Sequence, residues 1–141
     1  MPRKEPKQTI SPLVDWAFKF VFGRLVSVSL TLHMLNSILR RLGHELAVEL
    51  TLENPFNPGR KIEDKLLILD LLAKDQSGRS FNIEMQMHLF SGFESRTVYY
   101  LCRTHGDQLK KGANYRQVRP TIGITFVNEV LYPDKPEYEI G

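Results

Sequence analysis

The fold depends on two stretches of sequence, LLILDLLA at residues 66–73 and FNIEMQM at residues 81–87. Both have the length and the apolar content of β-strands, and turn-forming residues at 75–78 separate them. The first stretch places one carboxylate, Asp70, among leucine, isoleucine and alanine. Burying a carboxylate is costly unless it meets a cation or strong hydrogen-bond donors. Asp70 is therefore a candidate metal ligand.

The second stretch alternates between apolar and polar side chains, as a strand with two different faces does. One face carries Phe81, Ile83, Met85 and Met87, and the other carries Asn82, Glu84, Gln86 and His88. We expect the apolar face to join the core and the polar face to line a cleft or meet solvent. If the two strands form a hairpin, Asp70 lies beside Glu84, and their carboxylates, a backbone carbonyl and waters would hold Mg²⁺ or Mn²⁺. The alternative for Glu84 is an exposed position on a polar strand face.

The remaining sequence predicts an α/β fold with a mixed central sheet and flanking helices. Ser11 before Pro12 is typical of a helix start, and leucines at helical spacing from Leu25 to Leu42 indicate a second helix. The order is α-α-β-β-β-α-β. In chain order, we expect helices at 11–22 and 25–42, strands at 45–52, 62–73 and 80–88, a helix at 92–111 and a strand at 121–127.

The composition is that of an ordinary globular domain. The chain has 141 residues, of which 42% are hydrophobic and 25% are charged. No apolar run approaches the ~20 residues that a membrane-spanning helix needs, and the polar N-terminus lacks the apolar segment of a secretory signal. The single cysteine, Cys102, cannot form an internal disulfide. These features predict a cytoplasmic protein with no membrane partner, and they allow a homodimer without requiring one.

Basic residues gather towards the end of the chain. The net charge is only +3, but from position 96 to position 119 six basic residues stand against a single acid. In the helix expected at 92–111, three of them recur every seven residues and so share roughly one face, with a tyrosine alongside: Arg96, Arg103, Lys110 and Tyr99 or Tyr100. Such a face suits contacts with DNA phosphates, and an ordinary solvated helix face is the alternative.

Several motifs occur in an order that resembles a known family. Asp70 followed by EMQ at 84–86 resembles the signature of the PD-(D/E)XK nuclease superfamily, whose core has the same order of elements. Within that superfamily, the recombination-promoting nuclease/transposase family has motifs similar to SPLVDWAFKFVFG at 11–23, LNSIL at 35–39, IEMQ at 83–86, Arg96 with Tyr99-Tyr100, and QLKKGANY at 108–115. The resemblance extends from about Ser11 to Leu131.

The resemblance implies a restriction-endonuclease-like fold that hydrolyses DNA phosphodiesters in recombination or transposition, with Mg²⁺ as cofactor and DNA as partner. It implies that Asp70 and Glu84 bind the metal ion. Gln86 stands where the wider superfamily has a lysine; glutamine can orient a water molecule but carries no charge. Lys65 is a nearby substitute, but it lies an odd number of positions from Asp70 and should face the other way.

Asp15 is a further candidate for the catalytic site. In the superfamily an acid on the first helix often assists the metal site, which is the role that the resemblance implies for Asp15. The alternative is an acid in the first helical turn that offsets the helix dipole and pairs with Lys19.

The resemblance also suggests a domain organisation and leaves rival functions open. Residues 1–10 are expected to form a basic tail, 11–131 the nuclease-like domain, and 132–141 an acidic tail that begins missing C-terminal sequence, since family members are usually longer. The main rival function is a catalytically decayed DNA-binding or assembly module, which the missing lysine keeps open. A hydrolase of another phosphate ester would share the site chemistry, but a basic helix suits a polymer better.

Overall fold

The computed structural model describes residues 12–55, 70–86 and 89–134, and for residues 12–16 and Asp70 it describes the backbone. The basic tail expected at 1–10, the part of the second strand expected at 62–69, His88, and most of the acidic tail expected at 132–141 lie outside the described residues. The elements are α1 (Pro12–Phe22), the 3-10 helix η1 (Leu25–Ser27), α2 (Val28–Arg41), β1 (Leu50–Leu52), β2 (Asp70–Asp75), β3 (Ser80–Gln86), α3 (Phe93–Gly106), the 3-10 helix η2 (Tyr115–Gln117) and β4 (Thr121–Val127).

The strands form one mixed sheet in the order β1-β2-β3-β4. β2 pairs antiparallel with β1 and with β3, whereas β3 and β4 are parallel. Two parallel neighbours need a crossover connection, and α3 provides it. The predicted α/β class, the order of elements and the mixed sheet are confirmed.

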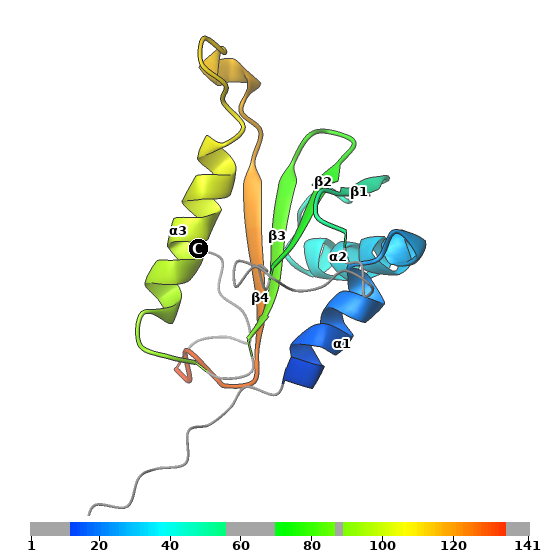
Figure 1. Ribbon diagram of the computed structural model, residues 1–141, viewed down its shortest axis with the longest axis vertical. Coiled ribbons are helices and arrows are strands. Elements are labelled where there is room, and N and C mark those ends of the chain that lie inside the picture. Colours follow the sequence, from blue (N-terminus) through cyan, green and yellow to red (C-terminus); the bar gives the residue numbers. More distant parts are fainter. Residues whose placement is uncertain (1–11, 56–69, 87–88, 135–141) are drawn as a thin grey trace, which may run out of the picture.

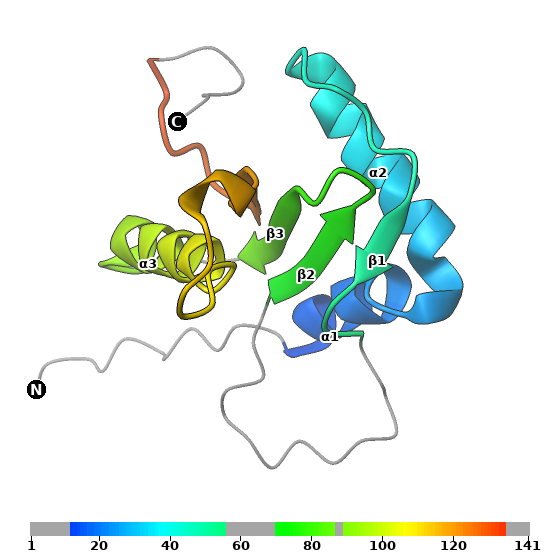
Figure 2. The ribbon, with the colours of Figure 1, turned by 90° about the horizontal axis from the view of Figure 1, so that it is seen from above.

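The helices cover both faces of the sheet. Figures 1 and 2 show α3 on one face and α1 with α2 on the other. The core lies on the side of α1 and α2, where five apolar side chains from the described parts of α2, β2 and β3 are completely buried: Leu35, Leu39, Ala73, Phe81 and Ile83. Each large apolar side chain buried in this way stabilises the fold by about 1.5–3 kcal/mol. The helical leucine pattern and the strand alternation both predicted this layer.

The first strand is shorter than predicted because side chains bind the backbone that precedes it. The Asn36 side chain donates to the carbonyl of Ala47 and accepts from its amide, both at 2.8 Å. Gln76 Oε1 accepts hydrogen bonds from the amides of Val48 and Glu49, at 2.9 and 3.2 Å. These backbone groups therefore have side-chain partners, and strand pairing begins only at Leu50.

The predicted helix at 92–111 also ends early, at Gly106. Glycine has low helix propensity, and the chain beyond it is drawn towards β4. The side chain of Gln108 donates to the carbonyl of Arg119 at 3.0 Å and accepts from its amide at 2.9 Å. Residues 107–120, which we call the tip loop, therefore leave α3 and connect it to β4. Lys110 and Lys111 belong to this loop and not to the helix.

Candidate active site on the α3 face of the sheet

The strand register places the two predicted metal-binding acids opposite each other. Asp70 on β2 is the direct cross-strand partner of Glu84 on β3. Directly paired residues belong to the same face of a sheet. The neighbouring pair, Leu71 and Ile83, belongs to the core, so Asp70 and Glu84 belong to the face that α3 covers. The hairpin predicted from the sequence is confirmed at this point.

The alternation of β3 is confirmed, but its polar face is covered and does not meet solvent. Asn82, Glu84 and Gln86 are only 8%, 5% and 3% exposed. The alternative of a solvent-exposed Glu84 is therefore wrong, because α3 packs across this part of β3 and β4. A buried carboxylate needs a compensating positive charge.

Arg96 on α3 provides a positive charge next to Glu84. Its Nη2 lies 3.1 Å from Glu84 Oε1, and the two side chains are 27% and 7% exposed. The guanidinium carbon also lies 5.6 Å from the ring centres of Phe90 and Tyr100. Arg96 was predicted to share roughly one helix face with Arg103 and Lys110, suited to contacts with DNA. Instead, it points into the layer between α3 and the sheet.

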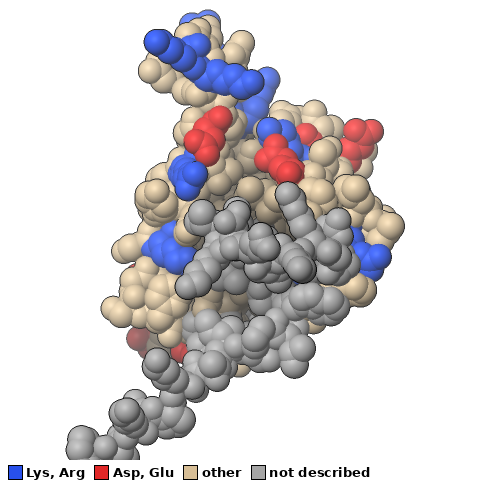
Figure 3. All heavy atoms as spheres, in the orientation of Figure 1, with Lys and Arg blue, Asp and Glu red and all other residues tan. Residues whose placement is uncertain are grey.

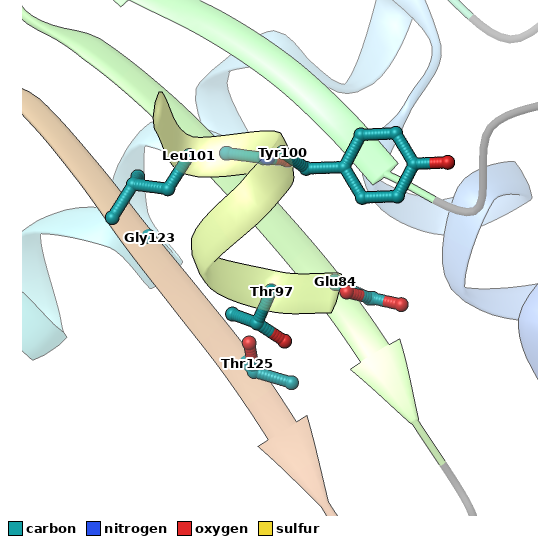
Figure 4. Close-up of a pocket in the computed structure, with 7 residues that line it drawn as sticks. Glu84, Thr97, Tyr100, Leu101, Gly123 and Thr125 are labelled. Atoms are coloured by element: carbon teal, nitrogen blue, oxygen red, sulfur yellow. The ribbon is translucent and has the colours of Figure 1, made fainter. Parts of the chain in front are cut away.

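A small cavity lies beside Glu84. Its lining comes from β3, β4 and α3 and consists of Asn82, Glu84, Thr97, Tyr100, Leu101, Gly123 and Thr125, and its volume is about 10 Å³. That volume holds about one water molecule. Figure 4 shows Thr97 and Thr125 close to each other, with Glu84 beside them. A Cβ atom at position 123 would lie 3.3 Å from Leu101 Cδ1, so glycine allows α3 to pack this closely on β4.

The sequence did not single out the two threonines or Asn82. Thr125 is the cross-strand partner of Glu84 on β4, and alternation along β4 could have placed it on this face. Asn82 was assigned to the polar face, but no role was given to it. Its Oδ1 atom is buried and, within the described part of the chain, has no hydrogen-bond partner, which marks it as an acceptor facing the cavity side of β3.

The other two predicted catalytic residues, Gln86 and Asp15, lie on different elements. Gln86 follows Glu84 by two positions and belongs to the same face of β3. Asp15 lies on α1, in the layer on the opposite face of the sheet, where Phe18 of α1 packs against Phe126 of β4. The structure describes only the backbone of Asp15, and its predicted part in the metal site stays a prediction.

The predicted basic face of a single helix is wrong, because Lys110 lies beyond the end of α3. Arg103 is on α3 and exposed, with its Nε 3.8 Å from Asp107. Most of the basic residues project instead from the tip loop, as Figure 3 shows at the upper end of the molecule. The exposed members of this basic group are Lys110, Lys111, Arg116 and Arg119, and Tyr115 beside them is 82% exposed.

The described residues contain neither a three-residue metal-binding cluster nor a membrane-spanning helix. Across residues 12–55, 70–86 and 89–134, no group of three or more His, Cys, Asp or Glu side chains is arranged to hold a metal ion. Within the same ranges, no helix has both the length and the apolar character to span a membrane.

Comparison with protein families gave one match that covers nearly the whole chain. A family model described as PD-(D/E)XK nuclease family transposase matches residues 12–140. Comparisons with curated proteins and with solved structures gave no significant match. The matched range includes both strands of the acidic pair, all of α3 and the tip loop.

Proposed function

Because the chain belongs to the PD-(D/E)XK nuclease family transposases, we propose that it hydrolyses DNA phosphodiester bonds with the help of a divalent metal ion, in recombination or transposition. The observation that carries this proposal is the register of the β2–β3 hairpin, which pairs Asp70 directly with Glu84. Two acidic residues at paired positions, one of them the buried Glu84, would concentrate negative charge, for which a cation is the natural partner.

The residues present suit a hard divalent cation. Carboxylates and backbone carbonyls are the ligands that Mg²⁺ prefers, and Mg²⁺ usually keeps several waters. We assign Asp70 and Glu84 as its ligands, and Mn²⁺ would fit the same oxygens. When bound, the metal ion would polarise the scissile phosphate, lower the pKa of a water molecule and balance charge on the leaving oxygen.

The remaining steps fall to polar side chains of the same face. Gln86 can orient the attacking water by accepting and donating hydrogen bonds, but it cannot take the proton as a charged base would. The fold holds Gln86 nearly fully buried, 3% exposed, so its amide has little freedom to turn. Orientation of this kind lowers the barrier by holding the reacting atoms in place before the reaction.

A second candidate function is DNA binding without cleavage. The closed state of the site favours it: Glu84 is 5% exposed, Arg96 lies on its carboxylate, and the adjoining cavity has a volume of only about 10 Å³. A scissile phosphate would need α3 or the Arg96 side chain to move. A chain that never opens in this way would bind DNA without cutting it.

A plasmid assay separates these two functions. Supercoiled plasmid is incubated with the protein in Mg²⁺, in Mn²⁺ and in EDTA, alongside Glu84→Gln protein. We expect nicked or linear DNA with either metal, none in EDTA, and none with Glu84→Gln. Retarded but intact plasmid under all conditions would establish the binding module and contradict cleavage.

We also infer that the tip loop is a DNA-binding surface. Its exposed basic residues flank Tyr115, which has a free ring face for a base or sugar. η2 within the loop begins at Asn114, whose side chain accepts from the Arg116 amide at 3.0 Å. This local bond and the Gln108 bonds fix the loop, so the charges are presented on a defined backbone.

Replacing Lys110 and Lys111 together by alanine should weaken DNA binding and its salt dependence. Each phosphate contact contributes about 0.9 to the slope of log K against log salt concentration, so the slope should fall by about two. The matched control is a different pair of consecutive exposed basic residues, Arg40 and Arg41 at the end of α2. Replacing this pair by alanine should leave the slope unchanged. Fluorescence anisotropy across a salt series in EDTA measures both. Equal slopes for the Lys110/Lys111 variant and the wild type would remove the tip loop from the DNA interface.

A further inference from the structure

We propose that Arg96 supplies from α3 the positive charge that the wider superfamily places on the strand as lysine, and that Arg96 contacts the scissile phosphate. This inference rests on the proposed nuclease function and deepens it. Gln86, at the lysine position, brings no charge to the site. Among the described residues, Arg96 brings a positive charge to the Glu84 carboxylate, at 3.1 Å.

The position of Arg96 matches what a phosphate contact at this site requires. Glu84 and Gln86 belong to one face of β3, and α3 covers that face. A guanidinium that forms an ion pair with Glu84 at 3.1 Å is close to any ion or phosphate that Glu84 helps to bind. The Arg96 side chain is 27% exposed, so it is reachable from solvent, while the carboxylate beneath it is nearly closed off.

Aromatic side chains hold the guanidinium in place independently of Glu84. The rings of Phe90 and Tyr100 lie at equal distances of 5.6 Å from its central carbon. Phe90 packs edge-on against Phe93, which is 6% exposed and anchors the start of α3. A guanidinium over an aromatic ring is attracted to the negative face of that ring. Arg96 would therefore keep its position when its ion pair with Glu84 is exchanged.

These contacts give Arg96 two successive roles. Without metal, Arg96 compensates the charge of the buried Glu84 carboxylate. Once Glu84 serves as a metal ligand, it no longer needs Arg96 as its counter-charge, and the guanidinium can donate two parallel hydrogen bonds to non-bridging phosphate oxygens. A guanidinium has hydrogen-bond donors and no acceptor, so Arg96 stabilises charge and does not activate the water.

The test removes the charge at Arg96 and then restores it at the lysine position. Cleavage under single-turnover conditions at saturating Mg²⁺ is measured for Arg96→Gln, Gln86→Lys and the double variant. We expect Arg96→Gln to lose about 10²-fold or more in rate, as when a preorganised charge on the transition state is removed. The double variant should regain at least about 10-fold, because the lysine restores a charge beside the same phosphate.

A control and a second readout accompany the rates. Arg24→Gln is the matched control, since Arg24 also lies over a ring, that of Phe20 at 4.5 Å, but belongs to the layer of α1 and α2. Calorimetric titration with Mn²⁺ in the absence of DNA reports whether Arg96 competes with metal for Glu84. Arg96→Gln should bind Mn²⁺ about 10-fold more tightly, since a neighbouring positive charge disfavours a second cation. Arg24→Gln should change neither property.

The outcomes separate failure of this inference from failure of the proposed function. If wild type cleaves DNA and folded Arg96→Gln cleaves within about threefold of it at saturating metal, Arg96 is only a structural counter-charge and the inference falls alone. Unchanged Mn²⁺ affinity would overturn it too. If wild type does not cleave, the proposed function falls and takes the inference with it. If Arg96→Gln does not fold, Arg96→Lys takes its place in the test. Lysine keeps the charge but cannot donate two parallel hydrogen bonds to a phosphate, so the cleavage rate should fall by about 10-fold. An unchanged rate would contradict the phosphate contact.

Discussion

Asp70→Asn is expected to lower Mg²⁺-dependent DNA cleavage by about 10²-fold or more, because it removes half of the carboxylate pair that would hold the metal ion. The paired register of Asp70 and Glu84 is the reason for choosing this residue. Asparagine has nearly the same shape and keeps one oxygen acceptor, so the effect would come from charge and not from packing. Nicking of supercoiled plasmid at a series of Mg²⁺ concentrations measures the loss.

The same substitution should have the opposite effect on stability when metal is absent. Two carboxylates at paired positions of neighbouring strands should repel each other, so neutralising Asp70 should leave the melting temperature in EDTA level or raise it. Asp134→Asn is the matched control, because Asp134 is exposed and lies outside both the acidic pair and the tip loop, so its replacement should affect neither property. A strong drop in the melting temperature of Asp70→Asn in EDTA would mean that Asp70 is a structural hydrogen-bonding residue.

Asp75→Asn is expected to destabilise the fold by about 3 kcal/mol, because it breaks a buried ion pair and leaves a cation without its partner. The Asp75 side chain is fully buried, and its Oδ2 accepts from Arg79 Nε at 2.7 Å. Its Oδ1 accepts from the amide and hydroxyl of Ser77 and from the amide of Arg79. These bonds close the β2–β3 turn and fix the register on which the acidic pair depends. Urea unfolding at pH 7 measures the change.

The stability that Asp75 provides should disappear in acid. Burial alone would raise the pKa of this carboxyl, but hydrogen bonds from Ser77 and Arg79 and the charge of Arg79 together lower the pKa below its ordinary value. A group whose pKa is lowered on folding stabilises the protein above its unfolded pKa, about 3.9. That contribution is lost as the pH falls through the lower, folded value. The difference in unfolding free energy between wild type and Asp75→Asn should stay constant from pH 6 to 8 and shrink below about pH 4. A difference unchanged down to pH 2 would contradict this account.

Local sequence patterns predicted most of the fold. The spacing of leucines in a helix and the alternation in a strand show which face of that element is buried, and this can be read from the sequence of the element alone. The predicted start and end of the first helix agree with α1 to within one residue, and β3 and β4 lie within their predicted ranges. The alignment of Asp70 with Glu84 followed from the same alternation, because a short turn between two strands permits few registers.

Contacts between distant residues were beyond local patterns. The Asn36 side chain bonds to the backbone of Ala47, 11 positions away, and β1 therefore starts later than predicted. The Gln108 side chain bonds to the backbone of Arg119, also 11 positions away, just beyond the end of α3. In both places a side chain bonds to backbone groups that a neighbouring strand could otherwise have bonded. The spacing of apolar residues in the sequence does not predict such contacts. The inward direction of Arg96 depends on how α3 lies across β3, and heptad spacing alone could not distinguish that face from an outer one.

The Gln108 hydrogen bonds join the two ends of the tip loop, so the length of the loop can change with little effect on the rest of the fold. One amide side chain ties both the N–H and the carbonyl of Arg119, so the two ends of the loop are held together whatever lies between them. Doubling the length of such a tied loop adds only about 0.6 kcal/mol of closure entropy. Relatives could therefore exchange or extend this segment without redesigning the sheet beneath it. The DNA contacts that we propose for this loop could then change while the β2–β3 hairpin that pairs Asp70 with Glu84 stays the same.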